Sequence, residues 1–161
     1  MHLDEEPLDI GYSSEKIVLS DYNDKELKIG GQNGKSQLLI TLPALDTATM
    51  QELSTIQKET FGLFNDCNTY VITSEEHPNV LDDTKITFLK DSEGEMGDFY
   101  GTRIADGEFA GKQTKALILI SKDGAIFYDE FLENLDDKFN TETLYRKMKA
   151  AQECYTGKGC H

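Results

Sequence analysis

The spacing of apolar and polar residues along this chain predicts a series of short strands interrupted by a few helices. Residues 36–42, SQLLITL, form an almost continuous apolar run of strand length, which is typical of a strand buried on both faces. Residues 115–132 predict two strands joined at Asp123 and Gly124 by a standard tight hairpin turn. Similar patterns predict an N-terminal hairpin from residues 15–22 and 25–31, and two further strands at residues 68–74 and 85–89.

A helical pattern directly follows the buried run. Pro43 breaks the strand, and Asp46 or Thr47 supplies a side chain that can cap the start of a helix. Beyond this cap, residues that can share one helical face recur at spacings of three and four. These residues are Met50, Leu53, Ile56, Thr60, Phe61 and Phe64.

Two more helices are expected in the second half of the chain. Residues 94–101, GEMGDFYG, predict a short helix that ends near Gly101. Closer to the C-terminus, Asn140 or Thr141 caps another helix. One face of that helix is apolar and carries Leu144, Met148 and Ala151.

The order of these elements predicts an α/β fold. A strand, a helix and a second strand in succession imply a parallel strand pair, and the terminal hairpin adds antiparallel strands. We therefore expect a mixed central β-sheet flanked by helices, with an N-terminal β-hairpin, as in thioredoxin-like folds. Within this interpretation, residues 1–14 are a loose lead-in, residues 15–152 form the domain, and residues 153–161 are a flexible, cysteine-containing tail.

The composition narrows the partners that such a domain can have. The chain has 161 residues, 38% of them hydrophobic, which is enough for one domain with its own core. Its formal net charge of -14 repels phosphate backbones and anionic lipid, so neither nucleic acid nor a membrane surface is expected as a partner. The acidic N-terminus does not look like a signal peptide, and three cysteines do not make a disulfide scaffold. A cytoplasmic location is therefore expected.

One stretch of the sequence carries a specific motif. Residues 42–50, LPALDTATM, contain Pro43, Asp46 and Thr47 at the spacing of a P-x-x-D-T-x-x-C pattern. Further along, Tyr100-Gly101 and the following ADGEFAGKQTKA look like a YG…DG…G…RA segment. With these two matches, residues 15–150 resemble the thiol peroxidases, which are atypical two-cysteine peroxiredoxins on the thioredoxin fold.

The resemblance implies a reaction site at the start of the first helix. In that family a cysteine in the first helical turn attacks peroxide as a thiolate, supported by a Thr hydroxyl and an Arg, and a second cysteine resolves the product. The corresponding site positions here are Pro43, Thr47, Met50 and Lys115. Met50 replaces the attacking cysteine, Lys115 replaces the arginine, and the shortened segment 75–85 contains no resolving cysteine.

These replacements predict that peroxide reduction at the usual site has been lost. A thioether cannot form a thiolate, and its slow oxidation to sulfoxide is not turned over without a reductase. Met50 also begins the apolar face of the helix, so it either packs into the old pocket or serves as a sensing or ligand-contacting residue. Helix N–H groups and one lysine would remain there for a small anionic or peroxide-like ligand.

The three cysteines provide an alternative location for redox chemistry. Cys67, at the end of the first helix, is expected to be a small buried hydrophobe or a displaced redox thiol. Cys154 and Cys160 are separated by five residues, two of them Gly, so a disulfide can close between them. Incidental cysteines in a frayed tail, a reversible thiol pair, and a metal site completed by His161 all remain open, although the spacing matches no common zinc pattern. We expect no cofactor and no metal.

Three functions follow from this sequence. The first is a thiol-peroxidase-like redoxin that is degenerate at the usual site and acts as a binding or regulatory protein. The second is an active thiol-disulfide oxidoreductase or peroxidase that uses Cys154 and Cys160, with Cys67, and a thioredoxin-type reductant. The third is a structural or assembly subunit. Whether the chain is an enzyme therefore stays undecided, and the resemblance alone implies an antioxidant family and a homodimer.

Overall fold

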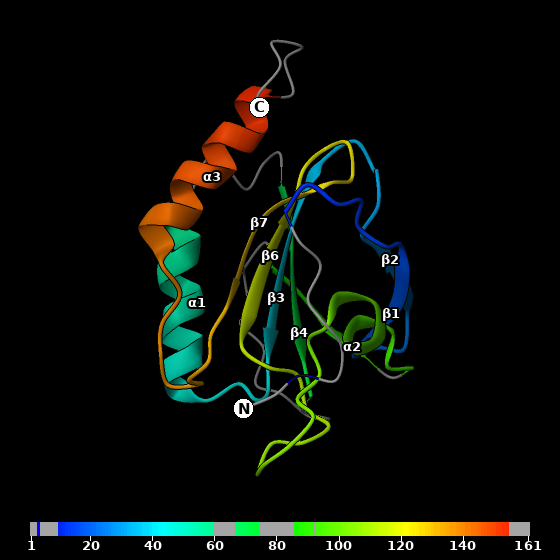
Figure 1. Ribbon diagram of the computed structural model, residues 1–161, viewed down its shortest axis with the longest axis vertical. Coiled ribbons are helices and arrows are strands. Elements are labelled where there is room, and N and C mark those ends of the chain that lie inside the picture. The colour runs from blue at the N-terminus through cyan, green and yellow to red at the C-terminus, as the bar shows by residue number, and fades with distance from the viewer. Residues whose placement is uncertain (1–2, 4–9, 60–66, 75–85, 92, 155–161) are drawn as a thin grey trace.

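One seven-stranded mixed sheet organises the protein (Figure 1). The computed structural model describes residues 3, 10–59, 67–74, 86–91 and 93–154. The strands lie in the order β2-β1-β5-β4-β3-β6-β7. In chain order the elements are β1 (Ile17–Asp21), β2 (Glu26–Ile29), β3 (Ser36–Leu42), α1 (Thr47–Glu59), β4 (Cys67–Thr73), β5 (Ile86–Lys90), α2 (Glu95–Tyr100), β6 (Ala116–Ile120), β7 (Ile126–Phe131) and α3 (Thr141–Cys154).

The central strand β3 determines how the other strands are arranged. Every one of its seven residues is buried, because it has neighbours on both edges and packed side chains on both faces. It pairs in parallel with β4, as the strand-helix-strand pattern predicted, and antiparallel with β6. The terminal hairpin β6–β7 and the N-terminal hairpin β1–β2 are both antiparallel, so the predicted mixed sheet is confirmed.

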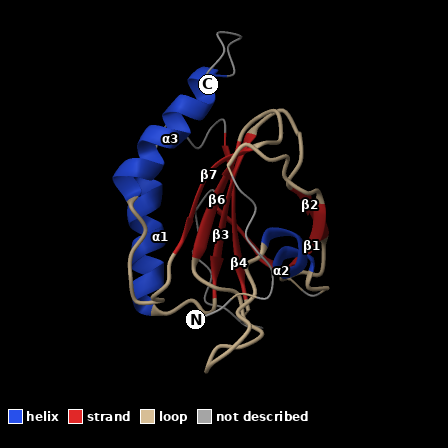
Figure 2. Ribbon diagram, in the orientation of Figure 1, coloured by secondary structure: helices blue, strands red, loops and turns tan. Residues whose placement is uncertain are grey.

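Helices cover both faces of this sheet. Figure 2 shows α1 and α3 together on one side and α2 on the other side, next to β1. Leu38 and Leu39, adjacent in β3, point to opposite faces and belong to two separate apolar clusters. We call the cluster that contains Leu53 of α1 and Leu144 of α3 the α1/α3 core, and the cluster that contains Met96 of α2 the α2 core.

Both long helices start at the residues that the sequence indicated. Asp46 caps α1 and Asn140 caps α3, in each case by accepting a hydrogen bond from the N–H three residues later. The predicted apolar face of α3 is confirmed, since Leu144, Met148 and Ala151 are all buried. The face predicted for α1 holds for Leu53 and Ile56, which are buried, and for the half-buried Met50, whereas Thr60, Phe61 and Phe64 lie outside the described residues.

Two local features differ from the sequence-based expectation or refine it. Cys67 is the first residue of β4 and does not end a helix within the described residues. The β6–β7 turn is centred on Lys122 and Asp123, because the N–H of Gly124 donates to Ser121 and Gly124 itself has a φ of 93°.

The described end of the predicted lead-in is bonded to the sheet. The N–H of Gly11 donates to the Ile126 carbonyl, and the N–H of Ile126 donates to the Tyr12 carbonyl, both at 2.8 Å. Ser14 adds backbone and side-chain hydrogen bonds to the Gly124 carbonyl. Residues 11–14 therefore extend the sheet contacts beyond β7, while the domain boundary at residue 14 stays a prediction. No helix in the described ranges is long and apolar enough to cross a membrane.

Gly30 tests how tightly the N-terminal hairpin is packed. Its φ is +80°, and an added Cβ would lie 2.0 Å from the Glu15 carbonyl oxygen and 2.2 Å from the Tyr100 hydroxyl. We expect Gly30→Ala to lower the free energy of unfolding by at least about 3 kcal/mol, since overpacking adds to the backbone strain. Urea denaturation followed by circular dichroism measures the loss.

Gly34 provides the matched control for this prediction. It has a similar φ of +85° but nothing within 4 Å of an added Cβ. Gly34→Ala should therefore cost only about 1 kcal/mol, the strain of the left-handed conformation alone. Equal losses for the two variants would contradict the packing explanation.

Candidate functional site

The turn between β3 and α1 is built around one carboxylate. Asp46 accepts a hydrogen bond from the Thr49 N–H at 2.8 Å, and the Thr49 hydroxyl accepts one from the Asp46 N–H at 2.9 Å. This reciprocal arrangement is a capping box, which sets the angle at which the chain enters the helix. The hydrogen bond from the Thr49 backbone lowers the pKa of Asp46, so Asp46 is ionised at neutral pH. A negative charge therefore already occupies the start of α1.

Met50 lies in the first turn of α1, where the resemblance places an attacking cysteine. Its backbone N–H donates to the Asp46 carbonyl at 3.0 Å, so this group is used by the helix itself. Its side chain is half-buried and packs against the α1/α3 core. Thr47 is exposed and Pro43 is half-buried, so the site positions have different environments. The thioether serves as packing here and offers no proton to any neighbour.

Lys115 is not a free cation. Its side chain is only 4% exposed and lies 2.5 Å from Oε1 of Glu52, whose side chain is 7% exposed. The same Nζ donates to the Asp137 carbonyl at 2.5 Å and lies 5.2 Å from the centre of the Phe139 ring. The second oxygen of Glu52 accepts the Phe139 N–H at 2.6 Å. Both charges are therefore buried, paired and hydrogen-bonded, as buried charges require.

The position of Lys115 follows from the strands around it. Lys115 directly precedes β6, and the hydroxyl of Thr41 in β3 donates to the Thr114 carbonyl at 2.7 Å. The Lys115 carbonyl accepts the N–H of Leu132, which follows β7. The backbone at Lys115 is thus held on both sides, and its side chain is directed toward α1.

Glu52 is the functional residue that the sequence reasoning missed. The chain has 30 acidic residues, and none of them stood out as a pairing partner. A signal was nevertheless present, because Glu52 lies four residues before the buried Ile56 and so shares the inward face of α1. An acid on a buried face requires a cation, and Lys115 was the cation already identified.

A small cavity lies beside this pair. Its volume is about 80 Å³, well below the several hundred Å³ typical of a metabolite pocket. Three acids and two lysines line it, so its surroundings do not favour an added anion. The lining residues are Asp46, Ala48, Thr49, Glu52, Lys115, Leu135, Asp136 and Lys138.

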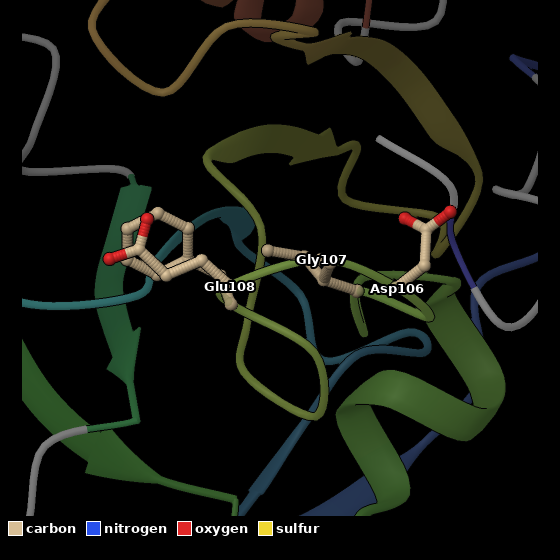
Figure 3. Close-up of a pocket in the computed structure, with 5 residues that line it drawn as sticks. Asp106, Gly107 and Glu108 are labelled. Atoms are coloured by element: carbon tan, nitrogen blue, oxygen red, sulfur yellow. The ribbon is translucent and has the colours of Figure 1, made fainter.

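A larger hollow occurs in the loop that follows α2 (Figure 3). It has a volume of about 360 Å³ and is lined by residues 104 and 106–109. The carboxylates of Asp106 and Glu108 lie on opposite sides of this loop and do not converge on one point. The hollow therefore offers no arrangement of acid, base or nucleophile.

The cysteines are placed very differently from one another. Cys67 is 4% exposed, and burial raises the pKa of its thiol to about 12. Such a thiol stays protonated at neutral pH and reacts poorly, which fits a buried hydrophobe. Cys154 is the last residue of α3, whereas Cys160 and His161 lie outside the described residues, as does the segment 75–85. The pairing of Cys154 with Cys160 thus stays a prediction, and the described ranges hold no cluster of three His, Cys, Asp or Glu suited to a metal.

Comparison with known proteins identifies the fold. The structure resembles a peroxiredoxin-like protein from Aquifex aeolicus with a TM-score of 0.82 at 21% identity, covering 92% of this chain and 91% of that one. It resembles a thiol peroxidase from Chromobacterium violaceum with a TM-score of 0.77 at 18% identity, covering 94% and 91%. It also resembles AhpC of Enterococcus faecalis with a TM-score of 0.69 at 21% identity, covering 100% of this chain and 99% of that one. No family model and no curated protein matches the sequence.

These neighbours confirm the thioredoxin-like α/β fold in the form found in peroxiredoxin-like proteins and thiol peroxidases. The identities are too low to carry a reaction or a partner from those proteins to this chain, because sites diverge faster than folds.

The cap of α1 gives a prediction with a definite pH dependence. Asp46→Ala should lower the free energy of unfolding by about 1 kcal/mol at pH 7, because the Thr49 N–H loses its acceptor. The pKa of Asp46 is lower in the native state than its usual 3.8, so the stabilisation is complete above that value and is lost as pH falls through the native pKa. The difference between the variant and the wild type should therefore shrink below about pH 4.

Asp46→Asn distinguishes the contribution of the capping hydrogen bond from that of the negative charge. The amide oxygen still caps the helix, so stability at pH 7 should change by only a few tenths of a kcal/mol while the acid-dependent loss disappears. Denaturant titrations between pH 2 and pH 7 measure both variants. A constant deficit for Asp46→Ala across that range would contradict the assignment of the charge to the cap.

The buried pair gives a prediction about coupling. Lys115→Met leaves the Glu52 carboxylate buried without its cation and should cost about 3–5 kcal/mol of unfolding free energy. Adding Glu52→Gln to that variant should recover at least about 1 kcal/mol, because no buried charge then remains. Thermal or urea unfolding of the two single variants and the double variant measures this. Strictly additive losses would show that the two side chains do not interact.

Proposed function

We propose that this chain is a thiol-peroxidase-like redoxin that does not reduce hydroperoxides at the start of α1 and acts instead as a binding or regulatory protein. The single observation that carries the proposal is Met50 in the first turn of α1, at the position where the resemblance places the attacking cysteine. A thioether has no proton to lose, so it cannot supply the thiolate that attacks peroxide.

The charges around the helix start support the same conclusion. A site that activates a thiolate needs uncompensated positive charge or free N–H groups. Here Asp46 accepts the hydrogen bond of the Thr49 N–H, and Glu52 forms an ion pair with the Lys115 ammonium. The lysine at the family's arginine position is therefore already paired, and the three acids beside it, Asp46, Glu52 and Asp136, outnumber the two lysines, Lys115 and Lys138.

The binding role is proposed for the surface around Thr47, Met50 and Lys115. Thr47 is exposed at the beginning of α1, while Lys115 is buried behind Glu52. A small anionic or peroxide-like ligand would have to compete with Glu52 for Lys115. A partner that contacts the exposed start of α1, such as a thioredoxin-type protein, would not face this competition.

The alternative is redox chemistry at Cys154 and Cys160. Cys67 is a poor third member, because its buried thiol has a pKa of about 12 and lies at the start of a central strand. Cys154 ends α3, so a pair with Cys160 would work at a site separate from Met50. Two further proposals accompany either candidate: a homodimer, drawn from the resemblance, and a reducing cytoplasmic setting, drawn from the N-terminal composition and the cysteine content.

Peroxide kinetics distinguish the two candidates. In a thioredoxin-coupled assay with hydrogen peroxide, the wild type should show no turnover above the protein-free rate, because Met50 forms no thiolate. Thiol titration before and after peroxide should find no fast loss of thiols, and Cys67 should label only after unfolding because its pKa is about 12.

Two variants make the outcome specific. Met50→Cys should gain one titratable thiol, which checks that the thiol titration detects this position. Cys154→Ser should leave the wild-type behaviour unchanged. Peroxide-dependent loss of two thiols that disappears in Cys154→Ser would instead establish the tail cysteines as the reacting pair, and turnover that survives this substitution would overturn both candidates.

A further inference from the structure

The segment between β7 and α3, residues 132–140, is fastened to the rest of the protein at both ends. At its beginning, the Leu132 N–H donates to the Lys115 carbonyl at 3.1 Å. Near its end, the Asp137 carbonyl accepts from Lys115 Nζ, and the Phe139 N–H donates to Glu52. Lys115 and Glu52 thus hold residues 137 and 139 of a segment that has no strand or helix of its own, and Glu130 of β7 accepts the N–H of Asn140 at its end.

Glu52 contacts both groups that hold this segment, Lys115 and the N–H of Phe139. Its carboxylate uses one oxygen for the Lys115 ammonium and the other for the Phe139 N–H. The ammonium has little contact with bulk solvent, because the lysine side chain is only 4% exposed. The carboxylate therefore makes the contacts that an external carboxylate would make with a buried lysine and a backbone N–H.

We propose that Glu52 is a built-in anion that fills a carboxylate site formed by Lys115 and the Phe139 N–H, and that in doing so it fastens residues 132–140 over α1. A small carboxylate can enter this site only when Glu52 is absent from it. The inference goes beyond the proposed function, since it concerns an occupied anion site and not peroxide chemistry.

Removal of the carboxylate would leave the ammonium of Lys115 and the N–H of Phe139 without their shared acceptor. The buried ammonium and the buried N–H then each lose a charged acceptor, which a neutral water molecule replaces only in part. The N–H belongs to the fastened segment, so this segment is the part that should open. The two sides of the cavity next to the pair belong to α1 and to residues 135–138, so a small anion has access from there.

Chemical rescue of Glu52→Ala tests the proposal. Removing the side chain beyond Cβ leaves space next to Lys115 that formate can occupy. Hydrogen exchange measured by mass spectrometry should show the amides of residues 132–140 exchanging at least about 10-fold faster in this variant, while those of β3 stay protected. Sodium formate at about 0.1 M should restore most of the protection, and sodium chloride at the same ionic strength should not.

Two controls make the result specific. Gln51→Ala changes the neighbouring exposed residue of α1 and should exchange like the wild type. In the double variant Glu52→Ala/Lys115→Met the cation is missing, so formate should have no effect beyond that of chloride. Peroxide turnover is not read in this experiment, so its outcome is separate from that of the proposed function.

Each outcome decides the matter. Formate-specific recovery in Glu52→Ala that depends on Lys115 supports the proposal. Unchanged exchange of residues 132–140 in Glu52→Ala, or equal recovery with formate and chloride, overturns it. If Glu52→Ala does not fold, Glu52→Gln keeps the shape and removes the charge. Faster exchange confined to residues 132–140 then supports the fastening, and equal acceleration in β3 overturns it.

Discussion

The buried pair of Glu52 and Lys115 is the constraint on which the arrangement around α1 depends. A single charge at this depth would carry a desolvation penalty of several kcal/mol, so each side chain is tolerated only in the presence of the other. Their contacts with Asp137 and Phe139 extend this requirement to the backbone. As a result, α1, the start of β6 and the segment before α3 are fixed relative to one another by charged hydrogen bonds, which apolar packing alone could not orient.

The same constraint limits what chemistry the start of α1 can perform. In a thiolate site the helix N–H groups and a cation act on a negative sulfur, and that action requires them to be free. In this protein Asp46 and Glu52 supply two negative charges from the protein itself. A third negative charge would meet two like charges and one lysine that is already paired. Electrostatics and the missing thiol thus favour the same interpretation, although they are independent features of the sequence.

Much of the fold could be predicted from the sequence because apolar periodicity and capping residues report directly on local structure. The run SQLLITL predicted β3, Asp46 predicted the start of α1, and the spacing of Leu144 and Met148 predicted the face of α3. The Glu52–Lys115 pair was not predicted, because the partners are 63 residues apart and only the folded sheet brings them together. The Asp123-Gly124 turn was placed correctly but centred one residue too late, since Gly124 adopts a positive φ that lengthens the loop.

The fold does not depend on a reactive sulfur at the start of α1. The residues that build the start of α1 are a cap, a buried strand and the apolar side chains of the α1/α3 core, and none of them needs a thiolate to be stable. Met50 contributes to that core through its thioether, so the replacement adds packing at a position where a cysteine would add less. Stability and chemistry are therefore supported by different atoms of the same turn. Because of this separation, a close match in backbone to a thiol peroxidase does not by itself imply its reaction, and the contact with the carboxylate of Glu52 gives Lys115 a structural role.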